Sequence, residues 1–136
     1  RVLFRSKNDK FEGIIVSSLH ENVSVLHPGE SIRFSVSCQK NVYVAIICID
    51  AQNEETWLPM QSNYIRAGES RIFPDIQGVV LKVRDGIYGK EQVKIYASTV
   101  ESELPKQGKM LGTRAFKLGV EGAENAETVI DYRVER

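Results

Sequence analysis

Hydrophobic and polar residues alternate along several short stretches of the chain. In residues 31–37 the apolar side chains of Ile32, Phe34 and Val36 alternate with polar ones, which predicts a half-buried strand. Residues 42–49 (VYVAIICI) are apolar on both faces, which predicts a central strand covered on both sides, as two stacked sheets would do. Further strands are expected at 13–19, 23–26, 56–59, 70–73, 79–83, 91–99 and 128–134, with a weaker candidate at 114–118.

The connections between these runs indicate the fold class. No segment shows a 3.6-residue period over ten residues, and the connections are too short for helical crossovers between parallel strands. We therefore expect an all-β, mainly antiparallel β-sandwich of about 7–9 strands, immunoglobulin-like in general architecture, with little or no helix. Residues 1–136 would form a single domain, in which a C-terminal extension, 100–136, adds a final strand.

Composition narrows the class of protein. The chain has 136 residues, 42% of them apolar, and its 18 basic and 18 acidic residues give zero net charge. This balance suits one globular domain with its own core and argues against a nucleic-acid partner. No apolar run is long enough to span a membrane. Residues 82–117 hold eight basic and four acidic residues, and 118–136 hold two and five. We expect the acidic final strand to lie beside the basic stretch and neutralise it.

Residues 27–60 (HPGESIRFSVSCQKNVYVAIICIDAQNEETWLPM) resemble the first half of a bacterial domain of unknown function, family 4384. The resemblance consists of a Gly-Glu entry at 29–30, an alternating strand, an aliphatic strand ending at Asp50, and a Trp-Leu-Pro segment at 57–59. It continues through Ala-Gly at 67–68, Ile-Phe-Pro at 72–74 and the closing strand at 88–94, and so covers about residues 23–99. Asn41 stands where Gly is usual, and Trp57 replaces a commoner Phe or Leu one place along.

This resemblance implies an accessory β-domain of bacterial proteins. Relatives in the family occur in envelope lipoproteins and beside caspase-like peptidase or kinase domains, so the resemblance implies a location in the bacterial envelope, periplasmic or lipoprotein-anchored. It implies no reaction, because the family has none assigned.

Residues with catalytic or metal-binding chemistry are few. Cys38 and Cys48 lie in apolar strand patterns, which favours buried thiols over a disulfide. His20 and His27, the only histidines, lack the spacing of a zinc site and are expected in loops. Asp50 suits a turn that uses its own backbone, with a calcium ligand as the alternative. The chain has no Gly-x-Ser-x-Gly motif. We expect no catalytic residue, metal or cofactor.

Aromatic residues are the main candidates for binding, because Trp and Tyr are common at interaction hot spots. The alternative is that they cap the ends of the core and keep their polar tips in water. Lys94 lies beside Tyr96 on the polar face of its strand, next to Gln92. The candidate binding residues are Trp57, Tyr64, Tyr88, Tyr96 and Lys94, and Phe73 belongs to the same aromatic set.

The sequence therefore favours a non-catalytic accessory or interaction domain whose partner is another protein or another domain of its own chain. The alternatives are a carbohydrate- or peptide-binding module and a hydrolase domain whose site is built from loops. Edge strands offer a further way to bind a partner, since a strand of the partner can pair with them. The apolar start of residues 1–12 (RVLFRSKNDKFE) would pair within the chain or bind a neighbour.

Overall fold

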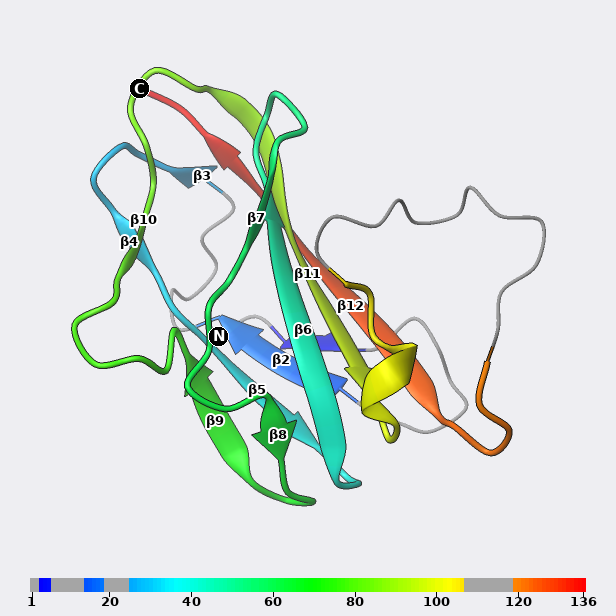
Figure 1. The fold of residues 1–136 in the computed structure, drawn as a ribbon. Helices are drawn as coiled ribbons and strands as arrows, with labels where there is room; N and C mark the ends of the chain where they lie inside the picture. Colours follow the sequence, from blue (N-terminus) through cyan, green and yellow to red (C-terminus); the bar gives the residue numbers. More distant parts are fainter. Residues whose placement is uncertain (1–2, 6–13, 19–24, 107–118) are drawn as a thin grey trace.

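The structure is a computed structural model that describes residues 3–5, 14–18, 25–106 and 119–136, and its strands form two facing sheets (Figure 1). The larger sheet has the order β3-β12-β11-β6-β7, and β8 also pairs with β6. Its strands are β3 (Val25–Leu26), β6 (Val42–Ile49), β7 (Glu55–Trp57), β8 (Tyr64–Ile65), β11 (Gly89–Ser98) and β12 (Asn125–Val134).

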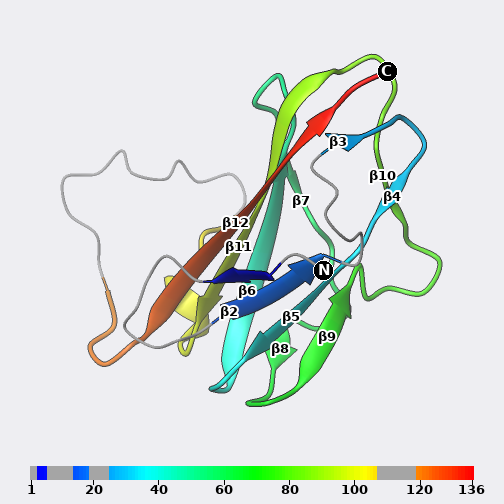
Figure 2. The same cartoon turned by 180° about the vertical axis from the view of Figure 1, so that it is seen from behind.

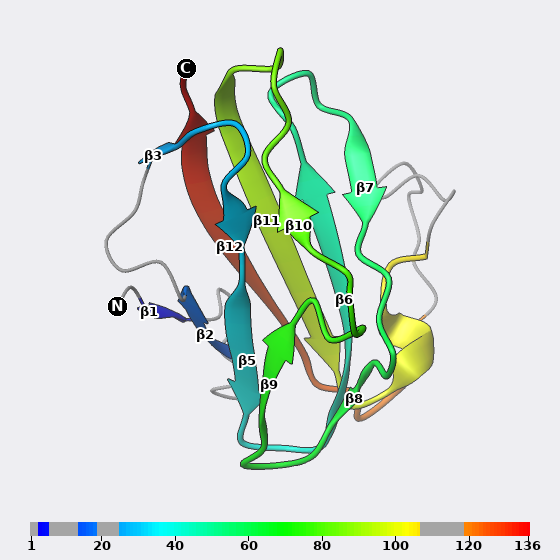
Figure 3. The same cartoon turned by 90° about the vertical axis from the view of Figure 1, so that its left-hand side faces the viewer.

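The smaller sheet has the order β1-β2-β5-β9 and lies across one face of the larger sheet (Figure 3). Its strands are β1 (Leu3–Arg5), β2 (Ile14–Ser18), β5 (Phe34–Cys38) and β9 (Ser70–Phe73). A two-stranded ladder of β4 (Ser31–Ile32) and β10 (Leu81–Lys82) extends the smaller sheet's side, and the single 3-10 turn of the described residues is η1 (Glu101–Glu103). All ladders are antiparallel except β3 with β12.

The core lies between the two sheets. Alternate residues of each strand point into it, so the period-two pattern of the sequence becomes one buried face per strand. Phe34 of β5 and Phe73 of β9 are fully buried, and their ring centroids lie 6.4 Å apart. Opposite them, the inward residues of the larger sheet include Val44, Ile46, Val93, Ile95 and Ala97. These features confirm the predicted all-β, mainly antiparallel sandwich with little helix.

The strands differ from the prediction in number and in detail. The described residues form twelve strands, because several ladders are only two residues long and because the stretch 31–37 is interrupted at Arg33. The expected strand 79–83 is reduced to β10, since the Val79 N–H donates to the Ile76 carbonyl in a turn and Val79 is 38% exposed. Strand β8 was not expected from the sequence. The weak candidate at 114–118 lies outside the described residues.

The central strand β6 is covered on both faces, but not by two sheets. The smaller sheet covers its inner face, where Val42, Val44 and Ile46 are buried. On the outer face Ala45 and Ile47 are also buried, at 8% and 1% exposure. A sandwich supplies only one partner sheet, so the outer face of β6 must be covered by other groups. Among the described elements, η1 packs against β6 on this side.

The N-terminal strand is held within the chain. β1 pairs antiparallel with β2, and both strands contact β12 (Figure 2). This arrangement agrees with pairing of the apolar start within the chain, for residues 3–5. No helix in the described ranges is long and apolar enough to cross a membrane.

Candidate binding face

The outer face of the larger sheet presents an ordered array of side chains. β6 pairs with β11, β11 pairs with β12, and β7 and β8 pair with β6, all antiparallel and in register. Residues directly opposite one another therefore share a face and stand in rows across the sheet. The outward rows are Asp131–Gln92–Ile49–Glu55, Val129–Lys94–Ile47–Trp57, Glu127–Tyr96–Ala45 and Asn125–Ser98–Tyr43–Tyr64.

The second of these rows places Trp57 and Lys94 on either side of Ile47. Neighbouring strands lie about 4.8 Å apart, so two strand spacings separate Trp57 from Lys94 by roughly 10 Å. Ile47 is 1% exposed, whereas Trp57 and Lys94 are both half-buried. In this row the buried aliphatic side chain of Ile47 lies between the Trp57 indole and the Lys94 ammonium group. Within the described residues Lys94 has no ion pair.

The third row adds a second half-buried aromatic ring, that of Tyr96. Tyr96 follows Lys94 by two residues on β11, so the two side chains lie about 7 Å apart along the same face. Burial raises the pKa of the Tyr96 phenol, and the negative charges of Glu127 and Glu55 raise it further. The phenol therefore stays protonated at neutral pH. The negative charges near it come from strands on either side of β11, β12 with Glu127 and β7 with Glu55.

The fourth row carries a tyrosine pair at one end of the face. The rings of Tyr43 and Tyr64 lie 5.0 Å apart between centroids and are tilted by 53°. Beside them, the Asn63 side-chain amide donates to the Glu101 carboxylate at 2.9 Å, which ties η1 to the β8 segment. At the opposite end of the face, the Gln92 amide donates to Asp131 at 2.7 Å. The aromatic rows are therefore bordered by polar groups at both ends.

Four of the five predicted binding residues thus share one face: Trp57, Tyr64, Tyr96 and Lys94. Tyr88 does not join them. Its ring packs against the core, its hydroxyl donates to Asp85, and the Arg136 guanidinium lies 5.2 Å from its centroid. Phe73 is a core residue with no exposed surface. Tyr88 therefore fits the alternative role of capping the core, and Phe73 is part of the core itself.

A polar cluster at one end of the inner face was missed by sequence reasoning. The Tyr132 hydroxyl donates to the Glu91 carboxylate at 2.8 Å. Burial raises the pKa of Glu91, and the charge of Asp50 raises it further. Burial also raises the pKa of Tyr132, and the negative charge of Glu91 adds to the shift. The sequence did carry a signal for this cluster. Glu91 and the buried Val93 are two residues apart on β11, so their side chains lie on the same face.

This cluster contains a thiol that is unsuited to nucleophilic attack. Burial raises the pKa of Cys48 to about 12, and the nearby Glu91 charge contributes to the shift. A thiol with so high a pKa is not a thiolate at neutral pH, and the thiolate is the nucleophile. Cys38 is buried and its pKa is also raised by burial. Both cysteines are free, as the apolar strand patterns predicted.

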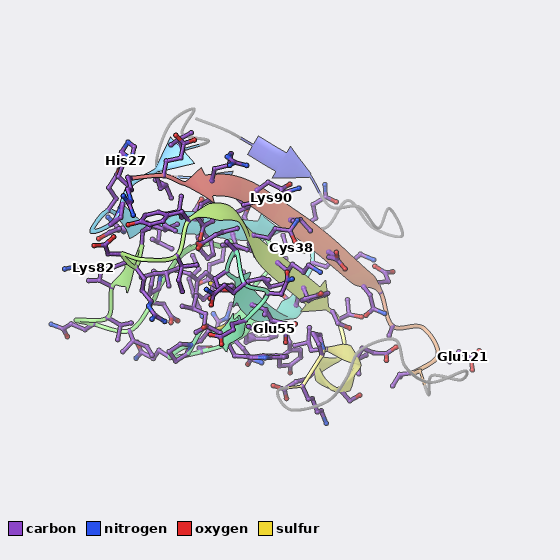
Figure 4. The ribbon with its side chains drawn as sticks, turned by 90° about the horizontal axis from the view of Figure 1, so that it is seen from above. His27, Cys38, Glu55, Lys82, Lys90 and Glu121 are labelled. Atoms are coloured by element: carbon purple, nitrogen blue, oxygen red, sulfur yellow. The ribbon has the colours of Figure 1, made fainter. Side chains whose placement is uncertain are left out.

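The remaining candidates have local structural roles. The Asp50 carboxylate accepts the N–H groups of Gln52 and Glu54 at 2.8 and 3.0 Å, which confirms the predicted turn. His27 lies beside β3, where its Nδ1 is 3.0 Å from the Glu135 carbonyl oxygen (Figure 4). His20 lies outside the described residues. In ranges 3–5, 14–18, 25–106 and 119–136, no three His, Cys, Asp or Glu side chains gather as a metal site would require.

The acidic final strand does lie beside part of the basic stretch, because β12 pairs with β11 along its whole length. The charges are not matched residue by residue, however. Lys90 stands opposite Arg133, and Lys94 stands opposite Val129 with Asp131 and Glu127 only at diagonal positions. Neutralisation is therefore partial and acts across the face rather than through direct pairs. Lys109, Arg114 and Lys117 lie outside the described residues.

Comparison with known protein families identifies a match. Residues 25–101, more than half of the chain, match a family described as Domain of unknown function (DUF4384). The matched range runs from β3 to the start of η1 and includes every strand of the outer face except β12. No curated protein and no solved structure matches.

Proposed function

Since this chain belongs to the DUF4384 family of domains of unknown function, we propose that it is a non-catalytic interaction domain of a larger bacterial, envelope-associated protein. It binds a protein partner, or another domain of its own chain, on the outer face of the larger sheet. The observation that carries this proposal is the register that gathers Trp57, Tyr96, Tyr64 and Lys94 on one face. Bacterial origin and an envelope location rest on the resemblance in the sequence.

The composition of the face supports a binding role. Trp and Tyr supply most of the energy at protein interfaces, and they act best when neighbouring groups exclude water around them. Here Trp57 stands opposite the buried Ile47 and Tyr96 stands opposite the buried Ala45, and the polar residues Gln92 and Glu127 lie on the same face. A contact surface with an aromatic centre and a polar rim is the usual anatomy of a protein interface.

The titratable groups support a role without catalysis. Catalytic nucleophiles need a lowered pKa or an adjacent base. The two thiols have raised pKa values, and the Asp50 carboxylate is engaged in its own turn. Glu91 has a raised pKa, and its described partners are a tyrosine hydroxyl and a backbone N–H. Because the pKa of the Tyr132 phenol is itself raised, the phenol keeps its proton at neutral pH and is a poor general acid.

The proposal is tested by displaying a library of bacterial protein fragments and selecting those that bind the domain. Fragments that bind the wild-type protein should bind Trp57→Ala about 30-fold more weakly, the loss expected for one hot-spot residue. Tyr96→Ala should weaken binding in the same direction. Ile72→Ala is the matched control, because Ile72 is an exposed apolar residue, 41% accessible, on the smaller sheet. Thermal melts establish that each variant is folded.

Two results would contradict the proposal. One is a set of fragments that bind Trp57→Ala and Tyr96→Ala as tightly as the wild-type protein. The other is turnover of ester, peptide or glycoside chromogenic substrates that scales with protein concentration, which would support the loop-based hydrolase.

Carbohydrate binding is a second candidate, favoured by the neighbourhood of Trp57 and Tyr96. An aromatic ring stacks on the apolar face of a sugar, and the Glu127 and Gln92 side chains on the same face could bond its hydroxyls. A glycan array separates the two candidates. A glycan signal that is lost in Trp57→Ala would favour carbohydrate binding, and an array without any signal would exclude carbohydrate binding.

A further inference from the structure

Strand β7 is an edge of the larger sheet. It is the last strand in the order β3-β12-β11-β6-β7, and it pairs only with β6 in the part of the chain that the structure describes. Figure 3 shows it running along the free side of β6. An edge strand keeps a row of backbone N–H and C=O groups unpaired, and such a row is a template for another strand.

The ladder identifies which backbone groups of β7 are free. The Leu58 N–H donates to the Ile46 carbonyl at 2.9 Å, and the Asp50 N–H donates to the Glu54 carbonyl at 3.0 Å. Hydrogen-bonded pairs alternate along an antiparallel ladder, so residues 54, 56 and 58 use their backbone groups toward β6. The backbone N–H and C=O groups of Glu55 and Trp57 therefore point away from β6, toward the free edge.

Side chains at this edge belong to the binding face. Trp57 and Glu55 stand opposite Ile47 and Ile49, so both side chains lie on the outer face. Figure 4 labels Glu55 on β7 and Lys90 on β11, on different strands of the same sheet. The segment from Asp50 to Trp57 (DAQNEETW) holds three acidic residues and no basic one. A strand that docks here would meet an indole and a local negative charge.

We propose that an extended peptide segment of the partner adds to β7 as a further strand, using the backbone groups of Glu55 and Trp57. It carries a Lys or Arg side chain beside Glu55 and an apolar side chain against Trp57. This inference rests on the proposed function and names the kind of partner segment that the face takes. The charge of the edge selects a cationic segment over a neutral or acidic one.

The same features disfavour a second copy of this chain as the occupant. Two β7 strands paired with each other would place two negatively charged segments side by side, and like charges close together destabilise a strand pair. Pro59 lacks an N–H and ends the edge on one side, and the Asp50 turn ends it on the other. A strand added to β7 can therefore pair over only a short length, so the side chains of β7 and of the added strand must provide the selectivity.

The experiment uses a phage-displayed library of random 12-residue peptides, selected on the whole domain. Selected peptides should be rich in Lys and Arg. They are then resynthesised with N-methyl groups at alternate backbone positions, which removes strand hydrogen bonds and keeps every side chain. One register of methylation should weaken binding roughly tenfold, the effect of one or two lost hydrogen bonds, and the other register should have little effect.

A pair of variants tests the same edge from the protein's side. Glu55→Ala removes the carboxylate alone, whereas Glu55→Pro also removes the outward N–H and leaves the ladder to β6 intact. Proline should weaken binding about three- to tenfold more than alanine does. If Glu55→Pro melts at a lower temperature than Glu55→Ala, the methylated peptides decide the matter, because they leave the protein unchanged.

The outcomes separate the inference from the proposed function. Peptides that need Trp57 but tolerate N-methylation in both registers would overturn strand addition and leave the binding face in place. A library that yields no peptide dependent on Trp57 or Glu55 would overturn the inference, and together with an unaffected fragment selection it would overturn the proposed function. A dimer in sedimentation velocity that Glu55→Pro dissolves would assign the edge to a second copy and overturn the inference.

Discussion

Replacing Thr128 with valine should stabilise the protein. Thr128 lies on the inner face of β12, opposite Ile95, and is 1% exposed. Its hydroxyl oxygen has no hydrogen-bond partner among the described contacts. A buried polar group without a partner costs its full desolvation free energy, about 1–3 kcal/mol. Valine keeps the branched shape and removes that cost, and it suits a strand.

The expected gain follows from these quantities. We expect Thr128→Val to raise the free energy of unfolding by about 1–2 kcal/mol, the lower part of the desolvation range. An unfolding entropy of about 2.1 cal/mol/K per residue gives about 0.3 kcal/mol/K for a chain of 136 residues. The melting temperature of Thr128→Val should therefore rise by about 3–7 °C.

The assay is thermal unfolding followed by circular dichroism, with urea unfolding to give the free energy. Thr128→Ser is the matched control, because it keeps the hydroxyl and removes a methyl group. It should lose about 1 kcal/mol from the lost burial. A Thr128→Val variant that melts below the wild-type protein would refute the reasoning, since the hydroxyl would then have a partner such as a buried water. The inner face would in that case hold a polar site, and the case for placing all binding on the outer face would weaken.

Other predictions concern the turn, the thiols and the inner acidic cluster. Asp50→Ala should lower the free energy of unfolding by about 1–2 kcal/mol in urea titrations, because two backbone N–H groups lose their acceptor, and Asp50→Asn, which keeps an oxygen there, should lose less. Iodoacetamide at pH 8 should leave Cys38 and Cys48 unmodified in the native protein and label both in urea, as mass spectrometry would show; rapid native labelling of Cys48 would contradict its pKa of about 12. The pKa of Glu91 is raised from 4.5, so the stability that its protonated form contributes is present below that pH and is lost as the pH rises through the folded-state pKa. Glu91→Gln stays neutral, so its melting temperature should rise relative to that of the wild-type protein as the pH increases above 4.5; a difference that does not change with pH above 4.5 would exclude this coupling.

The sequence predicts the long strands of this fold from two patterns, alternation of apolar and polar residues and a short apolar run bounded by polar residues. The residues 42–49 form β6 as expected, and the alternation around Phe34 and Val36 becomes the buried face of β5. Strands of two residues, such as β8, carry no period and arise from tertiary pairing alone. The unpartnered hydroxyl of Thr128 was not predictable, since nothing in the local sequence shows whether a buried hydroxyl finds a partner.

The candidate site was predictable as a set of residues but not as an arrangement. Sequence patterns placed Tyr96 and Lys94 on one polar face, because both lie on a single strand. Joining them to Trp57 requires the register between three strands, which depends on loop lengths and on the packing of both faces of β6. The same limit explains Tyr88, whose position after the Asp85-Gly86 turn brings it against the core.

The two sheets of this protein differ in what they place on their outer faces, and the difference bears on function. Each sheet buries one face in the core, so the fold requires apolar residues on one face of each sheet and places no such requirement on the other face. The outward residues of β5 on the smaller sheet are the serines Ser35 and Ser37, and the exposed Ile72 of β9 stands opposite Ser35 on the same face. The outward residues of the larger sheet instead include Trp57 and Tyr96, both half-buried. Large aromatic side chains are not required to complete a sandwich, because serine and isoleucine occupy these outward positions of the smaller sheet. This difference between the sheets is the basis of our proposal that a partner binds the outer face of the larger sheet.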